Sequence, residues 1–150
     1  MKRVVDRYKL DMEEIQDLLH YKKSNLKAPG YIFVSGLGSL ESVVKYMKEE
    51  LDYSYHKIAV ILNRDDRTIW ATFRSATSKH PKRFINVKSG FSIPLSILDD
   101  RRFGVLENMV LYMKDELQFR FKEIANLLGR DQRTIWTTYH RAKVKLHEVV

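Results

Sequence analysis

The stretch that decides the fold is IAVILNRDDRTIWAT, residues 58–72, which returns as IANLLGRDQRTIWTT at residues 124–138. Both stretches belong to a longer duplication, in which residues 41–76 align without a gap onto residues 107–142 at a constant offset of 66. Of these 36 aligned positions, 18 are identical. Self-similarity at one fixed offset indicates a supersecondary unit that is present twice.

The spacing within each stretch is typical of two helices that cross over a tight turn. The crossing point requires a small side chain, which Ala59 and Ala125 supply. A turn of three or four residues favours a residue that tolerates positive φ, and Asn63 and Gly129 occupy that place. A β-branched residue, Ile69 in the first copy, then anchors the second helix in the core. The pattern therefore predicts two helix-turn-helix units.

The flanking sequence predicts the remaining elements. Apolar residues at helical spacing predict a helix before each pair, with Ser39 as the N-cap of the first. Asp65 is the predicted cap of a third helix, and Asp131 that of its counterpart. Short apolar pieces at Tyr31–Val34 and Phe91–Leu95 are strand-like, and the second copy then carries about six extra residues, at 96–101. The predicted fold is mostly α, with two tandem three-helix helix-turn-helix units, these strand-like pieces and an N-terminal helix.

Two segments outside the duplication allow more than one interpretation. A capping-box pattern at Asp11–Glu14 predicts a short helix, which either promotes dimerisation or covers one of the units. The linker Ser78–Gly90 forms either a plain basic connector or a β-hairpin wing with Phe84–Val87 as one strand. Its cations are candidates for an arm that binds phosphate or the minor groove, namely Lys79, Lys82, Arg83 and Lys88. The predicted divisions are an N-terminal helical segment at 1–29, unit 1 at 30–77, the linker at 78–90 and unit 2 at 91–150.

Composition favours a folded protein with a polyanionic partner. The 150 residues are 44% hydrophobic and carry a net charge of +8, which favours partners whose phosphates it neutralises. The chain has no cysteine, which excludes disulfides, thiol catalysis and cysteine-based zinc sites. The five histidines lack the spacing of metal ligands, and neither a Gly-rich phosphate loop nor a nucleophile elbow is present. We therefore expect no catalytic residue, no metal, no cofactor and no enzymatic activity, and a location in the cytoplasm, on the nucleoid when DNA is bound.

The two stretches resemble the helix-turn-helix family of repressors and of the promoter-reading domain of sigma factors, region 4. The pattern shared by that family, roughly I-A-x-x-L-G-x-S-x-x-T-V, is matched by residues 58–69 and again by residues 124–135. The chain departs from it after the turn, where the usual apolar residue is replaced by Arg64 and Arg130. We expect both arginines to extend outward toward a phosphate.

The resemblance implies that the second helix of each unit lies in the DNA major groove, with its first residues at the base edges. Arg67 and Arg133 are then the predicted base readers, because a guanidinium can donate to both O6 and N7 of guanine; the alternative is a surface ion pair. Gln132 suits adenine, whereas Asp66 at the same position can accept only from cytosine N4. The two half-sites are therefore predicted to differ.

The predicted DNA contacts cover the outward face of each second helix. The two tryptophans of that face either pack against the preceding helix or contact sugar and thymine methyl groups, and the threonines of the first helical turn hold phosphates. In unit 1 the set is Arg64, Asp66, Arg67, Thr68, Trp70, Ala71 and Arg74. In unit 2 the set is Arg130, Gln132, Arg133, Thr134, Trp136, Thr137 and His140.

The leading functional hypothesis is sequence-specific binding of double-stranded DNA in the regulation of transcription, by tandem helices that read two half-sites. One alternative is a protein-interaction module that uses the tryptophans as anchors, for instance toward the transcription machinery. A second is a DNA-binding accessory of a recombination or replication assembly. Formation of a homodimer is a further alternative. Structured RNA is a poor partner, because the major groove of A-form RNA is too narrow for a helix.

Overall fold

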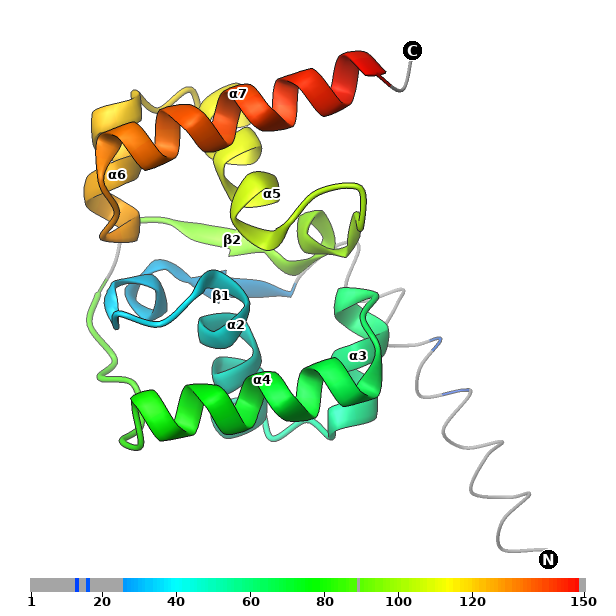
Figure 1. The fold of residues 1–150 in the computed structure, drawn as a ribbon. Helices are drawn as coiled ribbons and strands as arrows, with labels where there is room; N and C mark the ends of the chain where they lie inside the picture. Colours follow the sequence, from blue (N-terminus) through cyan, green and yellow to red (C-terminus); the bar gives the residue numbers. More distant parts are fainter. Residues whose placement is uncertain (1–12, 14–15, 17–25, 89, 149–150) are drawn as a thin grey trace, which may run out of the picture.

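The computed structural model describes residues 13, 16, 26–88 and 90–148, and within them the chain is mostly helical, as predicted (Figure 1). The predicted N-terminal helix lies almost wholly outside the described residues. None of the helices in the described part of the chain is long and apolar enough to cross a membrane.

The two copies contain corresponding elements in the same order, and the second copy has one additional π-helical turn. The first copy contains β1 (Lys27–Pro29), the 3-10 helix η1 (Gly30–Val34), α2 (Ser39–Glu49), α3 (Tyr55–Leu62) and α4 (Asp66–Lys79). The second copy contains β2 (Ser92–Pro94), the 3-10 helix η2 (Leu95–Asp99), α5 (Val105–Leu111), the π-helical turn η3 (Tyr112–Glu116), α6 (Phe121–Leu128) and α7 (Gln132–Glu148).

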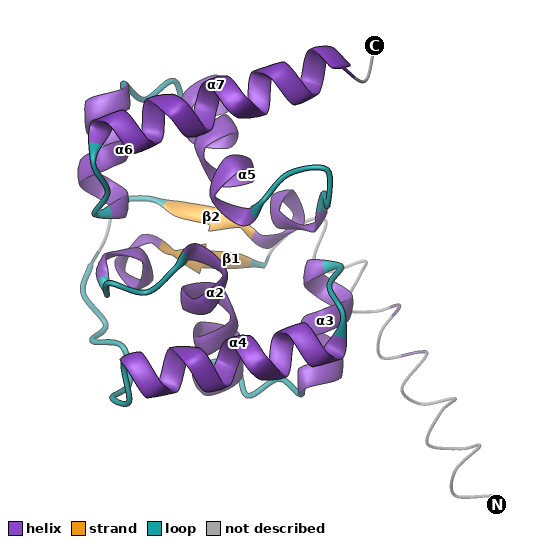
Figure 2. Ribbon diagram, viewed as in Figure 1, coloured by secondary structure: helices purple, strands orange, loops and turns teal. Residues whose placement is uncertain are grey.

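Two short strands from different copies pair at the centre of the molecule (Figure 2). β1 and β2 run antiparallel, with Ala28 opposite Ile93 at the middle of the pair, and both side chains are fully buried. These two residues are equivalent, because each precedes the proline that leads into a 3-10 helix, Pro29 before η1 and Pro94 before η2. A contact that joins equivalent residues across its centre has twofold symmetry. The copies are therefore related by an approximate twofold rotation.

Hydrogen bonds beside the strand pair obey the same symmetry. The Gly30 N–H donates to the carbonyl of Phe91 at 3.0 Å, and the Leu95 N–H donates to the carbonyl of Leu26 at 2.9 Å. Each bond becomes the other when the copies are exchanged. The Phe91 ring occupies the space beside Gly30, since a Cβ on Gly30 would lie 2.3 Å from a ring carbon of Phe91. A side chain at position 30 would therefore force the Phe91 ring of the second copy to move.

Each copy covers the helix-turn-helix of the other. The 3-10 helix η1 packs against α6, and η2 packs against α3. The Asn63 side-chain amide donates to the carbonyl of Asp99 at 3.1 Å, which ties the turn of the first copy to η2. Buried residues of both copies form one hydrophobic cluster that includes Val44, Ile58 and Ile124. The division into units at residues 30, 78 and 91 stays a prediction, but the core that supports them is shared.

The strand predictions are corrected by this arrangement. The Tyr31–Val34 piece is not a strand but lies in η1, and of Phe91–Leu95 only Ser92–Pro94 is extended. Of the two alternatives for the linker, the hairpin is not found among the described residues, because residues 83–88 are irregular and β2 pairs with β1 instead of Phe84–Val87. Short apolar runs do not by themselves distinguish a strand from a helical turn.

The predicted difference in length between the copies, in the segment before their first long helix, is also corrected. Pro29 and Pro94 correspond at an offset of 65, whereas Gly38 and Gly104, the N-caps of α2 and α5, correspond at the offset of 66. The second copy therefore contains one extra residue, in the segment 100–103 that replaces 35–37, and not the six that were expected near residues 96–101.

Candidate nucleic-acid interface

The two helix-turn-helix pairs have the geometry that their spacing predicts. Asn63 ends α3 at φ 54° and ψ 51°, and Gly129 ends α6 at φ 62° and ψ 36°, so both turns use a left-handed residue. Ala59 and Ala125 are buried where the helices cross, and Ile69 is fully buried at the start of α4. The small residue at the crossing, the left-handed residue in the turn and the β-branched residue in the core thus have the roles that the sequence predicts.

The second helix of each pair begins at an aspartate. Asp65 caps α4, its Oδ1 accepting from the Arg67 N–H at 2.9 Å, which confirms the predicted cap. Asp131 occupies the equivalent place before α7, where its carbonyl accepts from the Ile135 N–H at 3.2 Å. These contacts fix the first turns of α4 and α7, which carry the predicted base readers.

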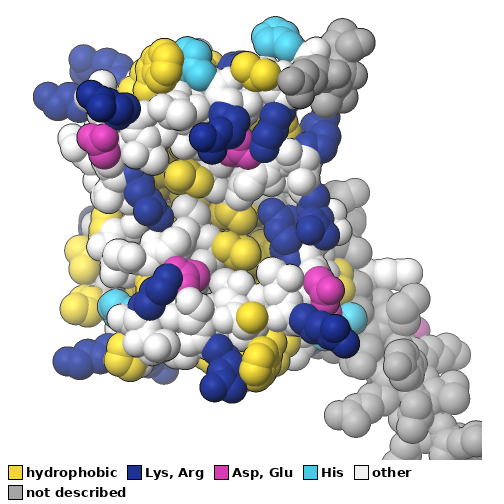
Figure 3. Space-filling model, viewed as in Figure 1, with side chains coloured by type: hydrophobic (Ala, Val, Ile, Leu, Met, Phe, Trp, Pro, Cys, Tyr) yellow, Lys and Arg dark blue, Asp and Glu magenta, His cyan; other side chains and the backbone are white. Residues whose placement is uncertain are grey.

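The helices α4 and α7 lie along opposite edges of one face of the molecule and run in opposite directions (Figures 1 and 2). In the same view, Figure 3 shows Lys and Arg side chains spread over this face, with apolar side chains between them. Twelve of the predicted contact residues are exposed, namely Asp66, Arg67, Thr68, Trp70, Ala71, Arg74, Gln132, Arg133, Thr134, Trp136, Thr137 and His140. Their contacts with DNA stay predictions.

The second of these units matches a known protein family. Residues 106–146 match the family model of sigma-70, region 4. The match begins in α5 and ends in α7, so it covers η3, α6 and most of α5 and α7. It confirms the resemblance to region 4, and the chain carries a DNA-binding helix-turn-helix. Comparisons with curated proteins and with solved structures gave no match.

The tryptophans of the two helix-turn-helix units are half-exposed and stack on the residue four positions later. Trp70 is 48% exposed, and the Arg74 guanidinium lies 4.8 Å from its ring centroid. Trp136 is 51% exposed, and its ring centroid lies 3.9 Å from that of His140. The same two positions therefore present a cation on an indole in α4 and an imidazole on an indole in α7.

The predicted base-reading positions also differ in their neighbours. Asp66 lies within hydrogen-bonding distance of His56, with 3.1 Å between Oδ2 and Nδ1, so its carboxylate has a partner within the protein. In the second unit the same two positions are held by Gln132 and Lys122. The sequence predicts different half-sites from the Asp66 and Gln132 pair alone, and the structure adds that Asp66 must leave or share its histidine to reach a base.

The arginines after the turns are more enclosed than predicted. Arg64 and Arg130 are half-buried rather than extended into solvent, and the guanidinium group of each donates to a backbone carbonyl. The Arg64 Nη1 donates to the carbonyl of Leu62 at 2.8 Å, and the Arg130 Nη2 donates across the junction to that of Leu37 at 3.1 Å. Burial, and next the charge of Arg101, lower the pKa of Arg64 below its ordinary value.

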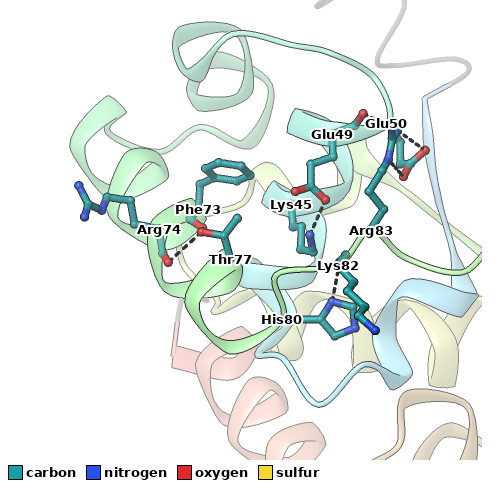
Figure 4. A network of polar contacts seen from close by, with 9 residues as sticks. All are labelled: Lys45, Glu49, Glu50, Phe73, Arg74, Thr77, His80, Lys82 and Arg83. Atoms are coloured by element: carbon teal, nitrogen blue, oxygen red, sulfur yellow. Dashed lines mark hydrogen bonds and ion pairs between the residues drawn. The ribbon is translucent and has the colours of Figure 1, made fainter.

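The predicted basic arm is held against α2 (Figure 4). Lys79 pairs with Glu41 at 3.0 Å, and Arg83 pairs with Glu50 at 3.1 Å. Arg83 also donates from Nη2 to the carbonyl of Glu49 at 2.9 Å, and its hydrogen bond to Glu50 raises its pKa. Lys82 and Lys88 of the same set are exposed. Two of the four cations are thus occupied within the protein, and the role of all four toward DNA stays a prediction.

A glutamate at the same position of each unit fastens the recognition helix, and the sequence analysis missed it. The carboxylate of Glu41 accepts from the Gly38 N–H at 2.8 Å, from the Ser75 hydroxyl at 2.6 Å and from Lys79. Glu107 accepts from the Gly104 N–H at 2.8 Å and from Lys145 Nζ at 2.6 Å. The N-cap of α2 is thus Gly38, not Ser39.

The signal for this contact was present outside the 36-residue block. Gly38 and Gly104, and likewise Lys79 and Lys145, are identical at the offset of 66. The glycines begin the first long helix of each unit, and the lysines lie near the end of the recognition helix. An identity scan extended beyond residues 41–76 would have found them.

Proposed function

We propose that the protein binds double-stranded DNA in a sequence-specific manner and regulates transcription, using α4 and α7 to read two half-sites. The observation that carries this proposal is the presence of two equivalent recognition helices on one face, each with its arginine, threonine and tryptophan exposed. The proposal assigns binding and no catalysis.

The roles of the side chains follow from their hydrogen-bonding capacity. Arg67 and Arg133 are exposed in the first turn and can each donate two parallel bonds to a guanine. Gln132 can both donate to and accept from an adenine. Thr68 and Thr134, exposed beside them, can donate to phosphate oxygens. The net charge of +8 adds attraction that does not depend on sequence.

The test is selection of duplexes from a random library with the full chain, followed by salt titration of the winning site. We expect enrichment of one bipartite sequence, with log affinity that falls linearly with log salt, by about 0.9 per phosphate contacted. Failure to enrich any sequence would contradict the proposal. Enrichment of one short site would leave a single reading helix.

A protein-docking role is the second candidate, and one surface favours it. An apolar pocket of about 540 Å³ lies beneath the linker, lined by Tyr31, Phe84, Phe91 and Leu127 among others, and Ile85 on its rim is 81% exposed. Docking into such a pocket would depend little on salt, whereas DNA binding weakens steeply with it. A pull-down whose yield is unchanged by raised salt would support this role.

A further inference from the structure

The symmetry of the molecule constrains the DNA sequence that it can read. A sequence duplicated in tandem can fold into units related by translation, which would suit two half-sites in the same orientation. The reciprocal bonds from Gly30 to Phe91 and from Leu95 to Leu26 instead relate the units by rotation. The helices α4 and α7 accordingly run in opposite directions on one face (Figure 1).

A groove lies between the two units and is lined by residues of both copies. It has a volume of about 460 Å³ and is lined by Arg64 from the first turn, Arg130 from the second and Arg141 from α7. Glu107 also lines it, with Oε1 paired to Lys145 at 2.6 Å and Oε2 buried without a hydrogen-bond partner among the described residues.

The arginines keep donors available in this groove. A guanidinium has five N–H donors. The carbonyl bonds of Arg64 and of Arg130 each use part of this capacity, and Arg141 is exposed. Burial around Arg64 and Arg130 also weakens the screening of their charges by water and salt. The groove is thus suited to phosphate oxygens rather than to a neutral ligand.

We propose that the cognate DNA is an inverted, imperfect repeat whose centre faces the groove between the units, where Arg64, Arg130 and Arg141 bind its phosphates. The inference rests on the proposed function. B-DNA has local twofold axes perpendicular to its length, so two readers related by a twofold meet half-sites of opposite orientation. The repeat is imperfect because the readers differ at Asp66 and Gln132.

Orientation is tested with duplexes that differ only in the arrangement of the selected half-sites. With the full chain, fluorescence anisotropy compares an inverted pair, a direct pair, an inverted pair with about half a helical turn inserted, and one half-site alone. We expect the inverted pair to bind at least about 10-fold more tightly than the other three, because the second contact is then intramolecular. A direct pair that binds equally well or better would overturn the inference while leaving the proposed function intact, as would no gain over one half-site. Failure of every duplex to exceed random DNA would instead overturn the proposed function.

The groove is tested with Arg141→Ala against Lys27→Ala, which removes the same charge from β1, outside the groove. Both side chains are exposed, so both variants are expected to fold, and thermal melts by circular dichroism check this. We expect Arg141→Ala to weaken binding to all duplexes by a similar factor and to lower the salt slope by about 1 relative to Lys27→Ala. Equal salt slopes for the two variants would show that the groove does not contact DNA.

Discussion

At the scale of single residues, equivalent positions have retained their backbone role while changing their chemistry. Asn63 and Gly129 adopt the same left-handed conformation, and either residue type tolerates it. On the outward face, by contrast, Arg74 stacks on its tryptophan where the second unit has His140. The residue at the turn can thus be asparagine or glycine, whereas the exposed residues distinguish the two proposed readers.

The proposed base readers give a prediction that separates base contact from charge. Arg67→Ala and Arg133→Ala should each weaken binding to the selected site by about 1–3 kcal/mol, measured by fluorescence anisotropy. Arg67→Lys is the matched control, because lysine keeps the charge but lacks the planar fork that binds guanine. We expect the lysine variant to lose most of the same affinity. Affinity close to that of the wild type would assign Arg67 to a phosphate instead.

Residue-scale features were predictable to the extent that they are local. The Asp65 cap and the positive-φ turns depend on neighbours within three residues, so the sequence predicts them correctly. The enclosure of Arg130 was not predictable, because its partner carbonyl belongs to Leu37, 93 residues away. A residue between two units is placed by the packing of both.

At the scale of elements, each recognition helix is fastened to the first long helix of its unit by a carboxylate. Burial opposes ionisation of Glu41, but hydrogen bonds from Ser75, Gly38 and Lys79 outweigh it and hold its pKa below the ordinary 4.5. Glu107 shows the same balance, with the bond from Lys145 as the largest opposing influence on its pKa. Both carboxylates therefore stabilise the fold when they are ionised.

This contact predicts a dependence of stability on pH. A carboxyl whose pKa is lowered by folding contributes stability above its unfolded pKa, near 4.5, and loses it as the pH falls through the folded value. We expect the melting temperature of the wild type to fall more steeply below about pH 4.5 than that of the Glu41→Gln, Glu107→Gln double variant. Glu116→Gln, at an exposed carboxylate, is the control and should follow the wild type. Parallel curves for the double variant and the wild type would contradict the proposed role of these carboxylates.

The helices themselves were largely predictable, and the strands were not. The stripes that bury Val43 and Met47 in α2, and Met109 and Met113 in α5 and η3, repeat at helical spacing. The short pieces at η1 and β2 are too brief for any period to distinguish a strand from a 3-10 turn. Their conformation depends on pairing across the centre of the molecule, which a local pattern does not contain.

At the scale of the whole molecule, the two copies depend on each other because the 3-10 helix of each packs against the helix-turn-helix of the other. Besides the helices of its own copy, α3 packs against η2 and α6 packs against η1 of the opposite copy, and one hydrophobic cluster includes both. Two copies of this size would each be marginal alone. We therefore expect the chain to unfold in one cooperative step.

The two tryptophans make this expectation measurable, since each unit contains one, and both side chains are about half-exposed. Trp70→Phe leaves Trp136 as the fluorescent reporter of the second unit, and Trp136→Phe leaves Trp70 as that of the first. In urea, the fluorescence midpoint of each variant should coincide with its own far-ultraviolet circular dichroism midpoint, and the two variants should agree. Separate midpoints for the two units would show that they unfold independently.

The sequence by itself determined the duplicated helix-turn-helix and its region 4 likeness. That motif is set by contacts between neighbours in the chain, through the small residue, the left-handed residue and the cap. Only the tertiary structure decided how the copies face each other. The antiparallel pairing of Ala28 with Ile93, 65 residues apart, turns a direct repeat in sequence into a rotated pair in space. Three-residue strands have no distinctive sequence pattern. The direction of α7 relative to α4 therefore depends on the pairing of β1 with β2, which only the tertiary structure contains.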